Sequence, residues 1–371
     1  MSENFGNKGY EDYFKALEQQ MNKPSVKPAE NISVTRETEN SPRRKGVYKV
    51  VRLRKSVIAV FLCIVLIITG SIVISGFSKE KTVPDTDTEQ ADKPKTDVAE
   101  KKRIKFLFDD TTAEISAEND AKSIIIVDKS SGKVVAARNA HERVYPASTT
   151  KIMTLLVAVE NITDFNDTFT MTLDITDPLY IEEASVAGFL NGEQITMTDL
   201  LYGTILPSGA DAAMGLAISV AGSEEAFVKL MNRKVKELGL KNTNFTNVSG
   251  LHNKNNYSSA YDMAIILDAA LQNDLCRKVL STYQHTTAIT PQHPEGILLS
   301  STLFSYMYGT EPETATILGG KTGFVNESGY CIASYGKCNS SQKEYLVVTM
   351  GNSARWPAFY GQIDLYKQFA K

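Results

Sequence analysis

Histidine and cysteine are both scarce in this chain of 371 residues, which contains four of each. The histidines are scattered along the sequence: His141, His252, His285 and His293. His141 is followed by a glutamate, but the second histidine of the zinc motif H-E-x-x-H is missing. A metallopeptidase is therefore disfavoured, no metal or cofactor is expected, and we interpret each histidine as a surface or loop residue.

The small number of cysteines limits the disulfides that the chain could form. Cys63 lies inside an apolar run, which leaves an odd number elsewhere: Cys276, Cys331 and Cys338. If Cys331 and Cys338 share one extended strand, the seven residue steps from one to the other span roughly 23 Å, which is too far for a disulfide. We therefore favour unpaired buried thiols over a bridge.

An excess of charge of one sign is also missing, because 40 Lys and Arg residues face 43 Asp and Glu residues and leave a net charge of -3. The C-terminal two thirds of the chain contain no basic stripe interleaved with aromatic residues. Nucleic acid is therefore not expected as a partner. Hydrophobic residues make up 42% of the chain. That is enough for one globular core of about 250 residues with appendages.

One apolar run, Val57 to Phe77, contains no charged residue over 21 positions. At about 1.5 Å rise per residue, a helix of this length matches a hydrocarbon layer roughly 30 Å thick. We therefore predict a transmembrane helix over residues 57–77, with membrane lipid as a partner. A buried core helix is disfavoured because the run has no polar face. A cleaved signal peptide is disfavoured because 56 residues precede the run.

The flanks of this run predict its orientation. Seven basic residues lie just before it: Arg43, Arg44, Lys45, Lys49, Arg52, Arg54 and Lys55. The positive-inside rule then places the N-terminus in the cytoplasm and the rest of the chain outside a plasma membrane that it crosses once. We interpret residues 1–56 as a disordered cytoplasmic tail. Residues 78–112, which contain Pro84 and Pro94, are interpreted as an extracellular stalk.

From about residue 113 the sequence predicts strands at both ends and helices between them. Two β-branched runs, Ser123–Lys129 and Lys133–Asn139, flank a glycine turn and predict a hairpin. Helical patterns then cover 151–162, 197–206, 211–222, 223–239 and 258–271. In the fourth of these, Ser223 is the expected N-cap and Gly239 the expected C-cap.

Strands return at 315–323, 329–338 and 343–352, before a last helix that begins near Trp356. This order predicts an α+β fold for residues 113–371. An antiparallel sheet formed from both ends of the domain would pack with a helical subdomain.

Serine followed by lysine at the third position beyond it occurs four times: Ser130/Lys133, Ser148/Lys151, Ser334/Lys337 and Ser340/Lys343. Only Ser148 opens a helical pattern, in which such a pair shares one face and the hydroxyl lies near the positive end of the helix dipole. Apolar residues follow Lys151, so burial would lower its pKa and free its amine to act as a general base. The alternative is that Ser148 caps the helix and Lys151 reaches solvent.

Two further segments offer polar groups for chemistry. Ser208 lies in Pro-Ser-Gly-Ala-Asp between two apolar helices, where its hydroxyl either faces a cleft or caps a helix. Lys321, Thr322 and Gly323 end an apolar strand. There the lysine and threonine would offer a cation and a hydroxyl to a carboxylate, and the glycine would let a substrate backbone approach the strand edge.

In this order the three segments resemble the signature S-x-x-K, S-x-N, K-T-G of the penicillin-recognising serine enzymes. Longer stretches are more specific: DAKSIIIVDKSSGKVVAARNAHERVYPASTTKIMT, SEEAFVKLMNRKVKELGLKNTNFTNVSGLHN, YSSAYDMA and GGKTGFVNESGYCIAS. They are similar to the low-molecular-weight D-alanyl-D-alanine carboxypeptidases over about residues 113–371. The resemblance implies a β-lactamase/transpeptidase-like fold and a penicillin-binding enzyme that removes the terminal D-alanine of peptidoglycan stem peptides.

The resemblance also implies a role for each matching residue. Ser148 would be the nucleophile and Lys151 its base, while Ser208 would relay a proton to the departing D-alanine amine. The substrate-binding residues would be Lys321, which supplies positive potential, Thr322, which binds the substrate carboxylate, Gly323, Phe324 and Arg355. The backbone N–H groups of Ser148 and Phe324 would form the oxyanion hole, and Arg355 is a further candidate for holding the carboxylate.

The sequence departs from the family pattern at Ala210, where the middle motif commonly has asparagine. This change motivates an alternative function, a non-catalytic muropeptide or β-lactam sensor with the same fold. A class A β-lactamase is disfavoured, because we find no E-x-x-L-N segment between the middle motif and K-T-G. The sequence ends soon after this domain, and we expect residues 57–77 to replace the C-terminal anchor of many relatives.

Overall fold

The computed structural model describes residues 105–310 and 312–371. The predicted cytoplasmic tail, residues 1–56, and the predicted membrane span, residues 57–77, lie outside the described residues, as does the predicted stalk up to residue 104. In the described part of the chain, no helix combines the length and the apolar character that crossing a bilayer requires.

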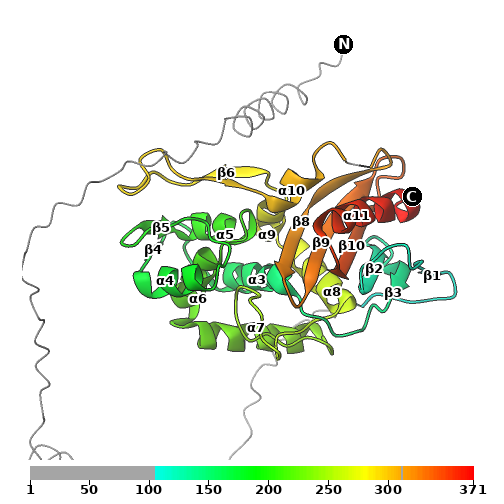
Figure 1. The fold of residues 1–371 in the computed structure, drawn as a ribbon, viewed down its shortest axis with the longest axis horizontal. Coiled ribbons are helices and arrows are strands. Elements are labelled where there is room, and N and C mark those ends of the chain that lie inside the picture. The colour runs from blue at the N-terminus through cyan, green and yellow to red at the C-terminus, as the bar shows by residue number, and fades with distance from the viewer. Residues whose placement is uncertain (1–104, 311) are drawn as a thin grey trace, which may run out of the picture. The chain divides into compact units, whose positions relative to one another are not determined.

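A six-stranded sheet joins strands from both ends of the described chain, which confirms the predicted α+β fold (Figure 1). The strand order is β1-β3-β2-β10-β9-β8. β10 pairs antiparallel with β2, so the predicted N-terminal hairpin and the C-terminal strands form one sheet. The short β1 pairs in parallel with β3. The strands are β1 (Ala113–Glu114), β2 (Ser123–Asp128), β3 (Lys133–Arg138), β8 (Ala315–Val325), β9 (Gly329–Cys338) and β10 (Glu344–Asn352).

The two faces of this sheet bury different side chains, because successive residues of a strand point to opposite faces. In β2, Ile125 and Val127 join the core that the sheet shares with the helical subdomain. Ile124 and Ile126 join the core beneath α11 (Arg355–Phe369). The sheet is therefore the middle layer, with α11 on one face and the helical subdomain on the other (Figure 1).

The helical subdomain is built around α3, in which every residue from Lys151 to Val159 is buried. Four of the helices that pack against α3 correspond to helical patterns in the sequence. The helices are α3 (Lys151–Asn161), α5 (Met197–Ile205), α6 (Ala210–Ala221), α7 (Glu224–Leu238) and α8 (Ala260–Leu271). This arrangement positions the start of α3 beside the end of β8, because η1 (Ala147–Thr150), which leads into α3, contacts that strand.

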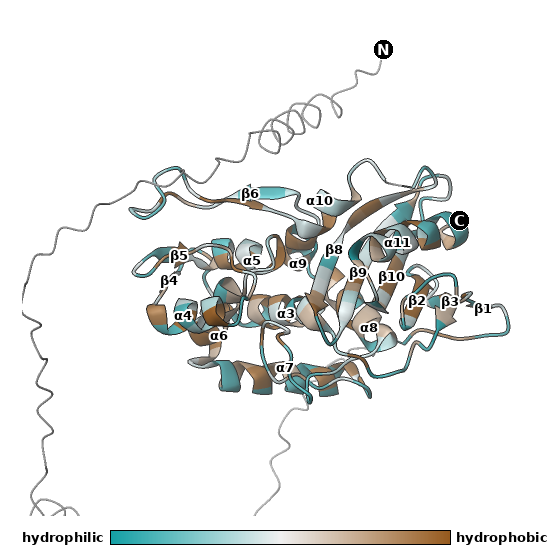
Figure 2. Cartoon of the chain, in the orientation of Figure 1, coloured by the Kyte–Doolittle hydropathy of each residue, from teal (hydrophilic) through white to brown (hydrophobic). Residues whose placement is uncertain are grey.

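Both predicted caps of α7 are confirmed. The Ser223 hydroxyl accepts the N–H of Ala226, and Gly239 ends the helix with a φ of 73°. The side chains that α7 buries recur every four positions: Phe227, Met231 and Val235. Figure 2 accordingly shows both hydrophilic and hydrophobic segments along α7, as expected for a helix with one face on the core.

Several short elements are absent from the sequence-based prediction, because three-residue strands and helices of six to nine residues leave little periodic pattern. The strands form two antiparallel two-stranded sheets apart from the main sheet. They are β4 (Thr168–Thr170) with β5 (Gln194–Thr196), and β6 (Gln284–Thr286) with β7 (Leu298–Ser300). The helices are α4 (Leu173–Ile181), which contains Pro178, α9 (Asp274–Leu280) and α10 (Thr302–Met307).

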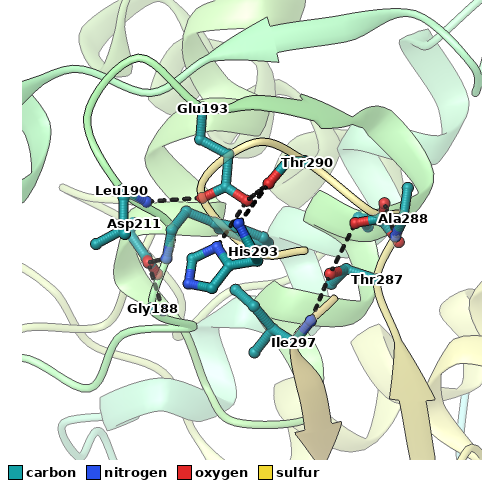
Figure 3. Close-up of polar contacts among 11 residues, drawn as sticks. Gly188, Leu190, Glu193, Asp211, Thr287, Ala288, Thr290, His293 and Ile297 are labelled. Carbon is teal, nitrogen blue, oxygen red and sulfur yellow. Dashed lines mark hydrogen bonds and ion pairs between the residues drawn. The ribbon is translucent and has the colours of Figure 1, made fainter. Parts of the chain in front are cut away.

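The β6–β7 hairpin docks on the helical subdomain through two histidine–carboxylate pairs. His285 Nε2 lies 2.7 Å from Asp199 Oδ1, and His293 Nδ1 lies 2.9 Å from Glu193 Oε1. The Glu193 carboxylate also accepts the hydroxyl of Thr290, as Figure 3 shows. The interpretation as surface or loop residues is therefore wrong for His285, which lies half-buried in β6 because a buried carboxylate pairs with it.

The three cysteines of the described chain are free and buried, which confirms the prediction of unpaired thiols. Cys331 and Cys338 both lie on β9, so the extended strand separates them as expected. Burial raises the pKa of Cys331 to about 11 and that of Cys276 to about 12. These two thiols therefore stay protonated and act as small apolar side chains.

Candidate active site

Ser148 and Lys151 meet at the junction between the 3₁₀ turn η1 and α3. The Nζ of Lys151 lies 3.0 Å from the Oγ of Ser148. The expectation that Ser148 lies in the α-helix needs correction, since α3 begins only at Lys151. Ser148 and Lys151 still lie on the same face, because residues i and i+3 of a 3₁₀ turn lie almost directly above one another.

The alternative roles for this pair do not fit the geometry. The N-cap residues of η1 and α3 are Pro146 and Thr150, so Ser148 caps neither helix. Lys151 is only 2% exposed, so its amine does not reach solvent. The predicted pairing of a serine hydroxyl with a buried lysine is therefore the arrangement that the described chain adopts.

A backbone carbonyl completes the surroundings of the pair. The amine of Lys151 donates to the carbonyl oxygen of Ser249 at 2.7 Å, and the hydroxyl of Ser148 approaches the same oxygen at 3.4 Å. Sequence reasoning missed Ser249 because it contributes a main-chain atom, which leaves no residue-type signal. Its carbonyl fixes the direction in which the Lys151 amine points.

Burial makes Lys151 a suitable base. Desolvation lowers the pKa of Lys151 to about 7, and the negative charge of Asp211 opposes this shift. A substantial fraction of the amine is then neutral near pH 7, with a lone pair that can accept the Ser148 proton. The reactive pair thus needs no histidine.

Lys321 is the second buried lysine of the site, and it is 1% exposed. Its amine donates to the carbonyl oxygen of Thr322 at 2.9 Å. Burial lowers the pKa of Lys321 well below its usual value, and the charge of Lys151 adds to this effect. Desolvation disfavours any buried charge, so only the smaller effect, the charge of Lys151, reflects a positive field that an incoming anion would meet.

Ser208 lies in the turn between α5 and α6, as predicted. The N-cap of α6 is Gly209, so the alternative role of Ser208 as a helix cap is wrong. Ser208 is buried, and its φ of 67° places it in the left-handed region. Ala147, just before Ser148, shares this uncommon geometry with a φ of 46°. Such strained positions persist only where the surrounding structure enforces them.

Gly323 lies close to η1. A Cβ atom at Gly323 would lie 2.8 Å from the backbone nitrogen of Ser148 and 3.0 Å from that of Thr149. The missing side chain therefore makes room for η1, and the access of a substrate backbone to this strand edge stays a prediction. This close approach brings the Ser148 N–H beside the strand that carries Phe324, the other predicted donor of the oxyanion hole.

Thr322 forms a link that the sequence did not suggest. Its Oγ1 lies 2.8 Å from the Oγ1 of Thr302, the first residue of α10. The backbone N–H of Thr302 donates to the carbonyl of Leu206, just before Ser208. Thr302 thus connects the middle motif to the K-T-G strand. Only the fold could reveal this, because 20 residues separate Thr302 from Thr322.

Arg355 lies among aromatic side chains. Its guanidinium is 4.9 Å from the ring centroid of Tyr306 and 6.0 Å from that of Tyr330. Tyr330 in turn stacks on Phe324 with centroids 4.3 Å apart. Arg355 is therefore near the Phe324 end of β8, but within the described chain its contacts are with rings rather than with Lys321 or Thr322.

A cleft of about 540 Å³ opens over Ser148 and Lys151. Its rim carries three carboxylates, Glu182, Glu183 and Glu327. This volume suits part of a peptide, and Ser148 is among the residues that line it.

The cleft wall includes Ala210, whose backbone N–H donates to the carbonyl of Ser185 at 2.7 Å. The buried carboxylate of Asp211 accepts the N–H groups of Ala187 and Gly188, a contact drawn in Figure 3. Asp211 thereby ties the loop beside the cleft to the start of α6, and the sequence signal for this role is only the acidic residue in the first turn of the helix.

The other serines with this spacing have partners other than their lysines, including Ser340, whose hydroxyl lies 3.3 Å from the sulfur of Cys338. Ser130 donates to Asp128, and Lys133 pairs with Asp109 at 2.8 Å. Ser334 is buried against Tyr366. The predicted distinction between Ser148 and these serines agrees with the geometry.

Comparison with known proteins gives the family. Residues 110–354 match the model of the peptidase S11 family, described as D-alanyl-D-alanine carboxypeptidase. The D-alanyl-D-alanine carboxypeptidase DacF of Bacillus subtilis is 36% identical over 232 residues, which are 61% of this chain and 56% of that protein. DacC of Escherichia coli is 40% identical over 179 residues, 45% of either chain. The chain thus spans about half the length of these curated relatives.

Solved structures agree with the fold. The Streptomyces K15 DD-transpeptidase superposes with a TM-score of 0.60 at 26% identity. The match covers 68% of this chain and 97% of the transpeptidase chain. Penicillin binding protein 5 from Haemophilus influenzae superposes with a TM-score of 0.59 at 29% identity. The match covers 67% of this chain and 70% of that protein's chain. The α+β fold is thus the one that these proteins share, and the chain belongs to the peptidase S11 family of D-alanyl-D-alanine carboxypeptidases.

Proposed function

We propose that this chain is a penicillin-binding serine D-alanyl-D-alanine carboxypeptidase. It would remove the terminal D-alanine of peptidoglycan stem pentapeptides through an acyl-enzyme on Ser148. The observation that carries the proposal is the 3.0 Å contact between the Ser148 hydroxyl and the buried amine of Lys151. Membership of the peptidase S11 family supports the choice of substrate.

In the first step, the Ser148 oxygen attacks the carbonyl carbon of the penultimate D-alanine. Neutral Lys151 accepts the hydroxyl proton, and the N–H groups of Ser148 and Phe324 stabilise the oxyanion. The terminal carboxylate of the substrate is held by Thr322, with Lys321 supplying positive potential. Arg355 is a further candidate at this end of the site, and the position of its guanidinium near Phe324 through Tyr330 supports that role.

In the second step, the peptide C–N bond breaks and the D-alanine nitrogen receives, through the Ser208 hydroxyl, the proton that Lys151 accepted. A water molecule then attacks the Ser148 ester; Lys151 takes a proton from this water and passes it to the Ser148 oxygen as the shortened peptide leaves. Ser208 is suited to this relay because it is buried and, among the residues described, no partner holds its hydroxyl. β-Lactams would acylate the same serine, because their strained amide presents the same carbonyl.

A sensor without turnover is the second candidate, and the observation that favours it is Ala210. Asparagine at this point would place an amide in the cleft wall, whereas Ala210 leaves only a methyl group there. The missing amide affects the positioning of substrate more than proton transfer, since Lys151 keeps both Ser148 and Ser249 as partners. The enzyme is therefore the favoured function.

The location is part of the proposal. Residues 57–77 would anchor the chain in the plasma membrane, with residues 1–56 in the cytoplasm and the catalytic domain outside. The seven basic residues before Val57 support this orientation. A reporter fused after Lys371 should then be active only if it is of a type that folds outside the cytoplasm. Protection of the domain from external protease in wall-less cells, with cleavage only after lysis, would contradict this location.

D-alanine release from a pentapeptide ending in D-Ala-D-Ala tests the enzyme against the sensor. The full chain should release D-alanine in a single turnover and in repeated turnovers. Ser208→Ala should bind the peptide but turn it over roughly 10² to 10⁴ times more slowly, as expected for the loss of a proton-transfer group. If the unsubstituted chain binds the peptide and releases no more D-alanine than Ser148→Ala, the sensor is the correct function.

A further inference from the structure

The Ser249 carbonyl, which contacts both reactive side chains, belongs to a tightly packed turn. Asn247 braces this turn, because its Oδ1 accepts the N–H of Gly250 at 2.7 Å and its Nδ2 donates to Leu251 at 2.9 Å. Gly250 has a φ of 84°, and a Cβ atom there would collide with the carbonyl oxygen of Ala147. The turn therefore lies against the residue that precedes Ser148.

Two side chains outside the turn hold the peptide groups on both sides of Val248, the buried residue before Ser249. The hydroxyl of Thr154, from α3, donates to the Val248 carbonyl at 2.7 Å. The carboxylate of Glu224, from α7, accepts the Val248 N–H at 3.0 Å. Val248 is 0% exposed, so water cannot replace either partner without opening the turn.

Glu224 is an unusual group to find at this place. Burial raises the pKa of its carboxyl, the negative charges of Glu225 and Glu182 add to the effect, and the Val248 N–H opposes it. Within the described ranges Glu224 forms no ion pair. The helix does not require it as a cap either, because Ser223 already accepts an N–H of the first turn. A half-buried carboxylate without a cation is costly, so its bond to Val248 is the feature to explain.

We propose that Glu224 is a positioning residue that holds the Ser249 carbonyl where it orients the Lys151 amine toward Ser148. A neutral amine has two N–H groups and one lone pair. When one N–H donates to Ser249, the lone pair can face the Ser148 hydroxyl; when this carbonyl moves, that alignment is lost. The inference rests on the proposed function, since it concerns the proton transfer that starts acylation.

Four variants of the full chain distinguish the effect of the Glu224 hydrogen bond to Val248 from the effect of the Glu224 charge. Glu224→Ala removes the acceptor. Glu224→Asp keeps the charge but shortens the reach to Val248, and it also covers the case that the alanine variant does not fold. Glu224→Gln keeps an acceptor oxygen at the same reach without the charge. Glu225→Ala is the matched control, because Glu225 is an exposed carboxylate in the same helical turn.

The measurements are the rate of acylation by a penicillin between pH 5 and 9, and kcat and KM for D-alanine release. We expect Glu224→Ala and Glu224→Asp to lower acylation and kcat roughly 10- to 100-fold with KM nearly unchanged, as for a small misplacement of a catalytic group. Glu224→Gln and Glu225→Ala should stay near the unsubstituted rate. The acidic limb of the pH profile should move to lower pH in the two impaired variants, because the ammonium form of Lys151 loses an acceptor.

Thermal unfolding and titration of reactive sites with the penicillin complete the test. Should Glu224→Ala and Glu224→Asp acylate at the unsubstituted rate, Glu224 has no positioning role. The acylation rate could also fall only because fewer molecules have a reactive site, while the acidic limb of the pH profile does not move. Glu224 would then only stabilise the fold, and this result also overturns the proposal. If the unsubstituted chain takes up no penicillin and releases no D-alanine, the proposed function fails and the inference fails with it.

Discussion

Two turns of the chain have the same spacing of serine and lysine but differ in how far the lysine is buried. One is the hairpin turn that leads to Lys133, and the other is the turn that leads to Lys151. Lys133 is exposed and bonds to Asp109, which raises the pKa of this lysine. Lys151 is buried, forms no ion pair within the described residues, and has its pKa lowered to about 7 by burial. Lys133 is therefore a permanent cation, whereas part of Lys151 is neutral near pH 7, as the proposed base must be.

The serines of the two turns differ in the same way. Ser130 donates to the carboxylate of Asp128, whereas Ser148 has the Lys151 amine at 3.0 Å. The backbone is the cause: the hairpin turn sends its serine and lysine to separate partners, and the 3₁₀ turn stacks them. Spacing alone thus does not create the reactive pair. A helical turn brings the two groups together, and burial then lowers the pKa of the lysine, so that part of its amine is neutral near pH 7.

Removing each serine gives the largest expected contrast. Ser148→Ala should abolish the covalent penicillin adduct and lower D-alanine release on the order of 10⁶-fold, because the nucleophile is lost. Ser130→Ala, the matched control, should keep both. Mass spectrometry of peptides from the treated chain locates the adduct. Full labelling of the Ser148→Ala variant would mean that another serine is the nucleophile.

Exchanging each lysine for arginine tests the base. Lys151→Arg should slow acylation roughly 10²- to 10⁴-fold, because guanidinium stays protonated at any working pH and cannot accept the serine proton. Lys133→Arg should acylate normally, since it can keep its pairing with Asp109. The rate of penicillin acylation measures both. Normal acylation by a folded Lys151→Arg variant would remove the lysine from the role of base.

The pH dependence of acylation gives the next expected contrast, because below the pKa of Lys151 the rate should fall about tenfold per pH unit. If neutral Lys151 is the active form, as proposed, its pKa of about 7 means that acylation should rise with pH, reach half its maximum near pH 7 and then level off. At one unit below that pKa the rate should be about a tenth of the plateau. Lys133→Ala should leave the curve in place. A plateau that extends unchanged down to pH 5 would contradict a lysine base with this pKa.

The same contrast explains what the sequence could predict. Long periodic segments identified the sheet from both ends and the buried helix α3, and the apolar neighbours of Lys151 indicated its burial. The Ser249 carbonyl could not be predicted, because a main-chain oxygen leaves no trace in the residue type. Thr302 could not be predicted either, because its partners Leu206 and Thr322 meet it only through the fold.

The smallest expected effect concerns Thr302, whose hydroxyl lies 2.8 Å from that of Thr322. If Thr322 binds the substrate carboxylate, Thr302 orients its hydroxyl, and Thr302→Val should raise KM for the pentapeptide roughly threefold to tenfold, the size of one net hydrogen bond. The control comes from the hairpin region, where the Thr112 hydroxyl donates to Val134. Thr112→Val loses a comparable hydrogen bond far from any reactive group, so its KM should not change. Both variants keep Lys151 intact, and their acylation should show the same acidic limb near pH 7. Steady-state kinetics with the pentapeptide measure the difference, and an equal KM for the two variants would show that Thr302 does not act on the substrate through Thr322.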